Sequence, residues 1–342
     1  MVTSRDVARL AGVSQSTVSY VMSGQRSISP ETRRRVEEAM AALRFRPHAG
    51  ARALASRRSR VVGLMVPFSP GADTTGVLPF IETIARCARE RDHNVLLATE
   101  DEGAGALERL AGGALCDALV LMDIEAKDPR TAVAAGLELP VILIGVPEDT
   151  GQLTCVDLDF EQAGRLAVDE LAACGHRRIV ELGYPRALVR RDVNFVRRFG
   201  RGALAAARRH GIPYTRVTPE DAGRTAVDAA LAEALALADG TDDLGLVVPE
   251  GRIVPAVLAR LAESGLTPGR DLSVLAVCTD DAAEATHPPV SNISTEPRTV
   301  SRTAMDALFR LLEDGPEPAR VGLVLPRLTR RHTTVPHPYP LP

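Results

Sequence analysis

The sequence predicts an α/β protein in which a small helical headpiece precedes a larger core built on parallel sheets. Three observations predict this. Residues 6–24 have the spacing of two short helices joined by a glycine turn. The first 60 residues carry 12 arginines and four acidic side chains, a formal charge of +8, whereas the remaining 282 carry −11. After residue 60, short apolar runs alternate with amphipathic segments, as in parallel sheets covered by helices on both faces.

The helical hairpin is expected in the stretch DVARLAGVSQSTVSYVMSG. Gly12 lies at the tight turn, where a residue that tolerates positive φ is favoured. Ser14 follows as the expected N-cap of the second helix. The residues that would pack between the two helices are small or β-branched, namely Val7, Ala8, Ala11, Val18 and Val21.

The second helix would expose a polar face made of Gln15, Ser16, Thr17, Ser19 and Tyr20. A short helix with polar side chains at its exposed N-terminal end fits the major groove of DNA. The alternative is an ordinary helical hairpin, which buries alanine and valine in the same way.

A third helix is expected to close the small core. Ser29-Pro30-Glu31 is a helix start, with a serine N-cap, proline in the first turn and an acid near the positive end of the dipole. The apolar residues that follow lie on one face: Val36, Met40 and Leu43. Three helices in about 45 residues favour a DNA-binding domain over an isolated hairpin.

The positive charge of the first 60 residues points to an acidic partner, and we expect nucleic acid. The arginines available to phosphates are Arg33, Arg34, Arg35, Arg44, Arg46, Arg52, Arg57, Arg58 and Arg60. The alternative for any single arginine is a solvated charged face.

Several function classes find no support in the sequence. There is no 18-residue apolar run and no signal peptide, so we expect a cytoplasmic protein without a membrane partner. The five cysteines are scattered and lack Cys-x-x-Cys spacing, which predicts reduced, mostly buried thiols. No zinc-ligand spacing, nucleophile elbow or phosphate-binding loop is present, so we expect neither a metal, a cofactor nor an enzyme.

The core is expected to form two similar lobes, because its strands are many for one short sheet. Strands are predicted at Val61–Val66, Val95–Ala98, Ala118–Met122, Val141–Ile144, Ile179–Leu182, Leu244–Val248 and Leu272–Val277. Helices are predicted near residues 80–92, 104–114, 161–174, 200–210, 224–238, 252–264 and 297–313. Ligands of open parallel sheets bind at the carboxyl ends of the strands, so a cleft between the lobes is the expected pocket.

These residues resemble the lactose-repressor-like (LacI/GalR) family of bacterial transcription regulators. The most specific parts are the helical hairpin, the segment SPETRRRVEEAMAALRFRPHAGARALASRRS, and later Val156–Ile179, Leu258–Val277 and Pro288-Pro289. The resemblance implies a helix-turn-helix headpiece at 1–46, a hinge helix and linker at 47–60, and a periplasmic-binding-protein-like core at 61–335. It also implies a homodimer on double-stranded operator DNA. Residues 336–342 are expected to form a loose tail.

By position, the resemblance assigns base reading to Gln15, Ser16 and Tyr20. It assigns phosphate contacts to Thr3, Ser14, Thr17 and Ser19. Most relatives carry arginine in place of Tyr20, so the preferred base at that position is open. We also expect Arg33 to contact DNA, through phosphate.

The expected hinge includes Ala51 and Leu54, which the resemblance places at the two-fold axis. Leu54 matches a leucine wedge that opens a base step in the minor groove. The alternative for Leu54 is ordinary helix packing. Gly50 lowers helix propensity, which suits a hinge that folds only on DNA.

The ligand pocket departs from the sugar-binding members of the family. Glu250-Gly251 stands in place of Asn-Asp, Cys278-Thr279 in place of Asp-Asp, and Phe199 in place of an arginine. The remaining candidates are Phe80, Asp157, Arg197, Arg198, Glu250 and Asp280. A purely structural role is the alternative for each: Phe80 in the core, Asp157 as a helix cap, Glu250 on an exposed loop.

The sequence therefore predicts a dimeric repressor of a near-palindromic operator, modulated by a sugar or another small polar metabolite. Two alternatives stay open: a regulator whose degenerate pocket binds no effector, and a solute-binding protein with a similar core. The basic headpiece argues against the second alternative.

Overall fold

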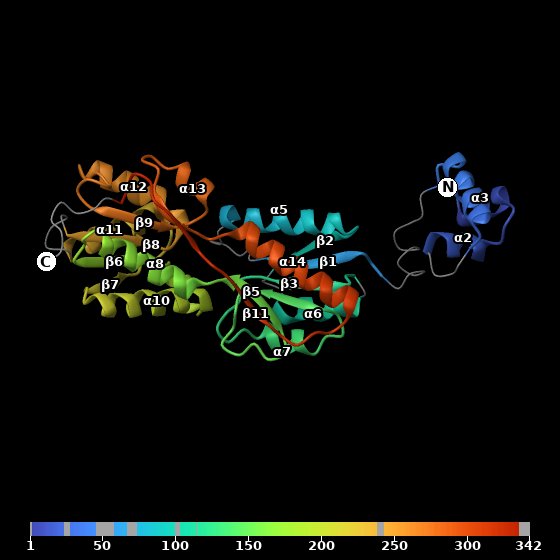
Figure 1. The fold of residues 1–342 in the computed structure, drawn as a ribbon, viewed down its shortest axis with the longest axis horizontal. Coiled ribbons are helices and arrows are strands. Elements are labelled where there is room, and N and C mark those ends of the chain that lie inside the picture. Colours follow the sequence, from blue (N-terminus) through green and yellow to red (C-terminus); the bar gives the residue numbers. More distant parts are fainter. Residues whose placement is uncertain are drawn as a thin grey trace.

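The computed structural model describes residues 2–23, 28–45, 58–66, 74–99, 103–113, 115–237 and 243–334. Three helices form the headpiece, and two α/β lobes form the core (Figure 1). The expected hinge residues Ala51 and Leu54 and the tail from residue 336 lie outside the described residues.

The headpiece contains α1 (Ser4–Ala11), α2 (Gln15–Ser23) and α3 (Pro30–Ala42). Met40 and Leu43 pack at partial burial against its core, which contains Ala39 and the residues predicted from the sequence: Val7, Ala8, Ala11, Val18, Val21 and Val36. Gly12 ends α1 at φ +64°, a left-handed conformation that favours glycine. Ser29 caps α3 by accepting a hydrogen bond from the Thr32 amide at 3.3 Å, with Pro30 at the first position. The local signals in the sequence therefore predicted this domain correctly.

The first lobe is a six-stranded, wholly parallel sheet in the order β11-β5-β4-β3-β1-β2. Its strands are β1 (Val61–Val66), β2 (Asn94–Thr99), β3 (Ala118–Leu121), β4 (Val141–Ile144), β5 (Thr154–Leu158) and β11 (Val321–Val324). Helices α5 (Thr74–Glu90) and α14 (Pro297–Asp314) cover one face. Helices α6 (Gly103–Gly112) and α7 (Arg130–Ala135) cover the other.

The second lobe has a six-stranded sheet in the order β12-β10-β9-β8-β6-β7, parallel except for β12. Its strands are β6 (Arg178–Leu182), β7 (Tyr214–Val217), β8 (Leu244–Val248), β9 (Ser273–Val277), β10 (Ser291–Ser294) and β12 (Arg327–Thr329). Helices α8 (Phe160–Ala173) and α10 (Asn194–His210) cover one face, and α11 (Arg224–Ala236) and α12 (Val254–Glu263) the other. The short helices are α9 (Arg186–Arg190), α13 (Asp280–Glu284) and the 3-10 turn Gly251–Ile253.

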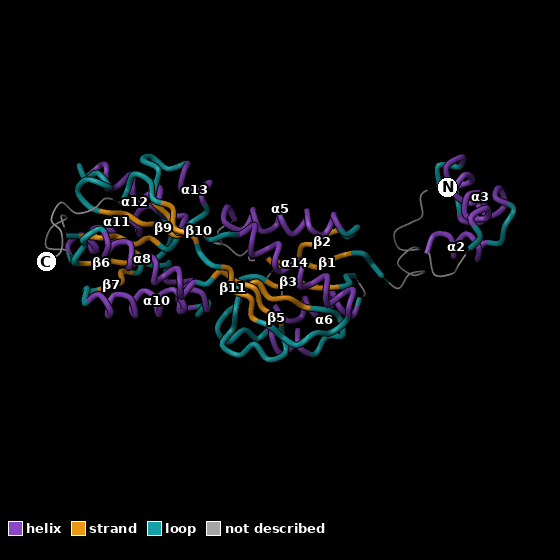
Figure 2. Tube along the Cα trace, in the orientation of Figure 1, coloured by secondary structure: helices purple, strands orange, loops and turns teal. Residues whose placement is uncertain are grey.

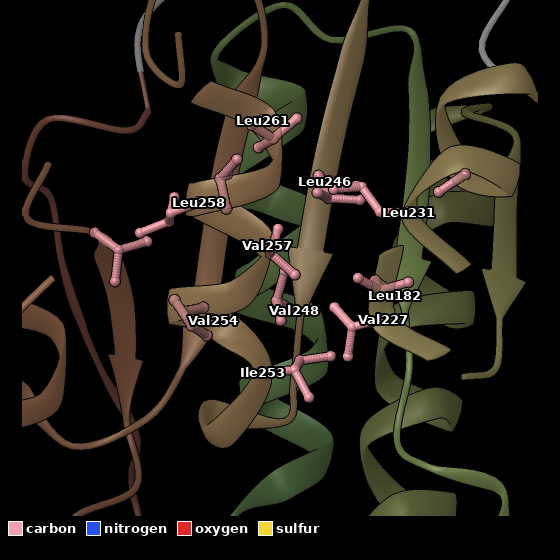
Figure 3. Close-up of a cluster of buried hydrophobic side chains, with 14 of the residues drawn as sticks. Leu182, Val227, Leu231, Leu246, Val248, Ile253, Val254, Val257, Leu258 and Leu261 are labelled. Atoms are coloured by element: carbon pink, nitrogen blue, oxygen red, sulfur yellow. The ribbon is translucent and has the colours of Figure 1, made fainter. Parts of the chain in front are cut away.

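Leucine, isoleucine and valine dominate the core under α11 and α12. Figure 3 shows Val254, Val257 and Leu261 of α12 beside Leu246 and Val248 of β8, and these residues are at most 1% exposed. Burying such side chains stabilises the fold by about 1.5–3 kcal/mol each, before the loss of chain entropy. This continuous apolar packing fixes the carboxyl end of β8, where Glu250 follows.

The chain crosses between the lobes three times: from β5 to α8, from β10 to α14 and from β11 to β12 (Figure 2). All seven predicted strands are present. The sequence analysis missed β5, β7, β10, β11 and β12 and the short helices α7, α9 and α13. Three of these strands, β7, β11 and β12, lie at sheet edges. Polar residues interrupt β7 and β12, and β11 is a four-residue run that includes glycine, so none of them is the longer apolar run that marks a buried strand.

Helices α8 and α10 pack closely because both carry small residues where they meet. A Cβ on Gly202 would lie 1.9 Å from the Glu161 carbonyl oxygen, and one on Gly164 would lie 2.1 Å from that of Phe199. Only glycine permits this approach of two backbones. The approach holds the second and third turns of α10 against the first two turns of α8, which follow the chain crossing.

Candidate DNA-binding and effector sites

The N-terminal end of α2 is capped and polar. Ser14 Oγ accepts a hydrogen bond from the Thr17 amide at 3.0 Å and lies 2.8 Å from Thr17 Oγ1. Ser14, Gln15 and Ser16 are exposed, whereas Thr17, Ser19 and Tyr20 are half-buried. The exposed end of α2 therefore presents hydroxyl and amide groups, which can donate to and accept from base edges.

One contact fixes α1 relative to α2, and another caps α1 itself. Gln15 Nε2 donates to Ser4 Oγ at 2.9 Å. The Thr3 amide and hydroxyl both donate to Asp6 Oδ2, at 3.0 and 2.8 Å, and these bonds hold the pKa of Asp6 below its ordinary value. In this structure, therefore, both Thr3 donors are engaged by Asp6 at the start of α1.

The arginines of α3 differ in their surroundings. Arg35 donates from one guanidinium nitrogen to the carbonyls of Ala11 (2.9 Å) and Gly12 (3.1 Å), so it stabilises the turn of the helix-turn-helix. Arg34 pairs with Glu38 on the surface. The sequence analysis grouped Arg35 with arginines free to meet phosphate, but its side chain is directed to the turn carbonyls, which lack helical partners.

Asp157 and Arg198 form a buried ion pair where the chain passes from β5 to α8. Arg198 donates to Asp157 Oδ2 at 2.6 Å and to the Leu158 carbonyl at 3.1 Å. Their side chains are 10% and 7% exposed. Burial raises the pKa of Asp157 to about 6, although the Arg198 charge opposes this rise. The N-cap of α8 is Asp159, so the alternative role of Asp157 as that cap is wrong.

Glu250 follows β8 and is also buried, at 6% exposure. Arg252 donates to both of its carboxylate oxygens, at 3.0 and 3.3 Å. The alternative that Glu250 lies on an exposed loop is therefore wrong. Tyr184 follows β6 and is buried. Burial raises the pKa of Tyr184 well above its ordinary value, and the negative charges of Glu250 and Asp157 raise it further.

An aromatic cluster joins these groups at the same lobe boundary. The rings of Phe160 and Phe195 stack at 5.0 Å, and Tyr184 meets Phe195 edge-on at 5.5 Å. Phe160 and Phe195 lie in the first turns of α8 and α10. The sequence analysis missed these aromatic residues, because they are far apart in the chain and belong to no motif.

Asp280 lies at the start of α13 and faces the chain segment that returns from the first lobe. It accepts hydrogen bonds from Arg327, from Asn292 Nδ2 (3.2 Å) and from Arg331 (3.5 Å). Burial alone would raise the pKa of Asp280, but the bonds from Arg327 and Asn292 outweigh burial and lower it. Asp280 is thus tied to a chain crossing and does not join the Asp157–Arg198 pair.

The other two candidates lie elsewhere. Arg197 is exposed and pairs with Glu148 of the first lobe and Asp192. Phe80 is partly buried in α5, packed on the core of the first lobe, and its carbonyl faces Ser301 Oγ at 3.5 Å.

Further contacts between the lobes surround Arg197, and no sequence signal identified them. Arg191 pairs with Asp123 (2.8 Å) and Glu125 (3.2 Å), which follow β3. Asn194 donates through Nδ2 to the Val146 carbonyl, after β4. The loops at the carboxyl ends of β3 and β4 therefore contact the start of α10 directly.

Comparison with known proteins decides the family. The sequence pattern of the lacI family of bacterial regulatory proteins matches residues 3–48, and that of the periplasmic-binding-protein-like domain matches residues 168–334. The transcriptional regulator CelR of Thermobifida fusca is 30% identical over 330 residues, 93% of this chain and 94% of that protein. This chain belongs to the lacI family of bacterial regulatory proteins.

Solved structures of lacI-family proteins have the same architecture as this lacI-family chain. The lac repressor dimer bound to operator and the anti-inducer ONPF aligns with a TM-score of 0.81 at 25% identity, covering 98% of this chain and 99% of that one. The complex of CelR with cellobiose aligns with a TM-score of 0.68 at 23% identity, covering 97% and 100%. The predicted α/β fold with a helix-turn-helix headpiece and a two-lobed core is confirmed.

This lacI-family regulator thus combines a DNA-binding helix-turn-helix with a periplasmic-binding-protein-like core. The similar proteins are transcriptional regulators and not enzymes. In the described part of the chain, no helix is both long enough and apolar enough to cross a bilayer. Nor do three His, Cys, Asp or Glu side chains gather there in a way that could hold a metal ion. The five cysteines are buried and free.

Proposed function

We propose that this lacI-family protein is a repressor that binds a near-palindromic operator as a homodimer and responds to a small polar molecule bound between its lobes. Each headpiece would read one half-site with α2 in the major groove. Effector binding would change how the two lobes meet and thereby change the affinity for DNA. A coupling of about 1–3 kcal/mol is enough for 5–150-fold control.

The exposed N-terminal end of α2 carries this proposal. We assign base contacts to Gln15, Ser16 and Tyr20. Phosphate contacts fall to Thr3, Ser14, Thr17, Ser19 and Arg33. The Gln15–Ser4 bond would open on DNA, since an amide can exchange a hydroxyl partner for the adenine edge. Residues 47–60 are assigned to the connection between headpiece and core; Ala51 and Leu54 keep their expected roles at the minor groove from the resemblance alone.

For the effector, we propose the region around Asp157, Arg198, Glu250 and Tyr184. Asp157 lies near the end of β5, Tyr184 and Glu250 follow β6 and β8, and Arg198 lies in the second turn of α10, so a ligand there would touch both lobes. Ligand hydroxyls would have to replace existing contacts, because Arg198 and Arg252 already pair with the two carboxylates. A sugar or another small polar metabolite supplies such hydroxyls.

The direct test is a gel-shift titration of the full-length protein against fragments of its own genome at stated salt concentrations. We expect one class of fragments to be retained well above random duplex, with binding that weakens as salt rises. Retention that ignores sequence would contradict specific regulation.

A second candidate is a regulator whose pocket takes no effector, and the internal pairing of Asp157 and Glu250 favours it. Thermal-shift screening against sugars, polyols, nucleosides and sugar phosphates separates the two candidates. A compound that raises the melting temperature and releases the retained DNA fragment removes the second candidate.

A further inference from the structure

The carboxylate of Asp117 binds the chain at the point where the connection from the headpiece enters the core. Asp117 precedes β3. Its Oδ1 accepts from the Ser59 amide at 2.7 Å and the Ser59 hydroxyl at 2.8 Å. Its Oδ2 accepts from the Arg60 amide at 2.7 Å. Three donors from two adjacent residues therefore converge on one anion, and charge-assisted bonds of this kind are about twice as strong as neutral ones.

The backbone of Arg60 adopts an uncommon conformation for this purpose. Its φ is +53°, in the left-handed region that a non-glycine residue adopts only at an energetic cost. This turn directs successive N–H groups toward the same anion. The Arg60 carbonyl in turn accepts from the Asn94 amide at 2.8 Å, and the Asp117 amide donates to the Val61 carbonyl at 2.8 Å. Residues 59–61 are thus attached to the starts of both β2 and β3.

The carboxylate side of these bonds is mostly covered by protein, whereas Arg60 itself is exposed. The side chain of Asp117 is 11% exposed, and the buried Nε2 of His93 lies 3.9 Å from Oδ2. The His93 ring meets Phe309 of α14 edge-on at 5.0 Å. The Asp117 carboxylate therefore sits among β1, β2, β3 and α14 of the first lobe, so a displacement of that lobe reaches residues 59 and 60 directly.

We propose that Asp117 is a positioning residue for DNA binding: it fixes the place and direction in which the chain leaves the core for the headpiece. The proposal rests on the proposed dimeric operator binding. The two headpieces of a dimer act together only if their tethers hold them at the half-site spacing. Without the carboxylate, residues 59 and 60 lose the bonds that attach this connection to the core.

Simple lengthening and loss of positioning predict different results. If the loss of these bonds only lengthened the connection by a few residues, the effective concentration of the second headpiece would fall by less than about twofold, since it falls roughly as the −3/2 power of length. Loss of positioning also removes the fixed direction in which the chain leaves the core, so the two headpieces no longer start at the half-site spacing. We therefore expect Asp117→Asn to weaken binding to a full two-half-site duplex at least tenfold, with binding to a single half-site unchanged.

The experiment uses the full-length protein and a genomic duplex retained by the wild type, intact and cut to one half-site. Ser59→Ala is the milder variant, and Asp149→Asn is the matched control, because its carboxylate accepts a local bond from the Gly151 amide in the same lobe. Full-duplex binding by both Asp117→Asn and Ser59→Ala within twofold of the control overturns the proposal.

Amide hydrogen exchange makes the test independent of DNA. Asparagine keeps one acceptor oxygen, so in Asp117→Asn the Arg60 amide loses its partner and should exchange at least tenfold faster, while the amides of β1 and β3 stay protected. If wild-type protein retains no specific duplex, dimeric operator binding fails on its own, and the exchange result still decides whether Asp117 holds the tether. Unchanged exchange of the Arg60 amide overturns the proposal in either case.

Discussion

Replacing Arg198 with methionine tests the buried ion pair at the lobe boundary. Methionine fills a similar volume but donates nothing, so Asp157 loses its 2.6 Å partner and the Leu158 carbonyl loses its 3.1 Å partner. A charge-assisted bond contributes about 1.5–3 kcal/mol and a neutral one about 0.5–1.5 kcal/mol. Removing one partner of a buried pair costs about 3–5 kcal/mol in total. We expect a loss of stability of that size at pH 8.

The loss should shrink in acid, because Asp157 can take up a proton. Its folded pKa of about 6 lies above the ordinary 3.8, so the folded chain binds this proton more readily than the unfolded chain. The contribution of Asp157 to stability is therefore largest below about pH 4 and declines as the pH rises to about 6, by roughly 3 kcal/mol. At pH 5 the carboxyl is mostly neutral, and Arg198→Met should cost only about 1–2 kcal/mol.

Urea unfolding of the full chain at pH 5, 6, 7 and 8, followed by far-ultraviolet circular dichroism, measures both effects; the chain has no tryptophan to serve as a probe. Arg201→Met is the control on the same helix, because Arg201 is 64% exposed and pairs with Glu161 at the surface. Its cost should stay below about 1 kcal/mol. Equal costs for Arg198→Met at pH 5 and pH 8, or a cost matching that of Arg201→Met, would refute the reasoning.

Further predictions concern the helices. Gly202→Ala should destabilise the second lobe by about 1–3 kcal/mol in urea unfolding, because the methyl group meets the Glu161 backbone. The control is Gly105→Ala in α6, which has open space around it and should be neutral or stabilise by about 0.5–1 kcal/mol. Equal effects of the two substitutions would contradict the close helix crossing. Arg35→Met should destabilise the headpiece, because the turn carbonyls lose their donor, and the amides of α1 should then exchange faster. Unchanged protection of these amides would count against that role of Arg35. In gel shifts, Gln15→Ala should relax base preference, whereas Arg33→Ala should mainly reduce the salt slope, and the reverse pattern would exclude our assignment.

The headpiece was predictable from the sequence because its determinants are local. The Gly12 turn and the Ser14 and Ser29 caps act within a few residues, and the core residues Val7, Val18 and Val36 all lie within 30 residues of the chain. The apolar strands of the core were predictable for the same reason, since a buried parallel strand is a continuous run of aliphatic residues. The order of strands within each sheet was not, because pairing partners lie far apart along the chain.

Asp157, Arg198 and Glu250 were among the six pocket candidates from the sequence, which left their partners open. Whether a carboxylate is exposed, caps a helix or pairs with an arginine 41 residues away depends on which backbones meet. The close crossing of α8 and α10 at Gly164 and Gly202 brings Arg198 to Asp157. No periodic pattern in the sequence indicates that Arg198 and Asp157 meet.

By itself, then, the sequence determined the headpiece, the family and the alternation of strands and helices, since these follow from short-range spacing and from motifs. Only the tertiary structure decided that the chain crosses between the lobes three times, that Arg191 and Asn194 meet the loops after β3 and β4, and that Asp117 binds residues 59 and 60. The physical reason is that ion pairs and buried hydrogen bonds have energies set by distance and burial, which exist only once distant segments have packed together.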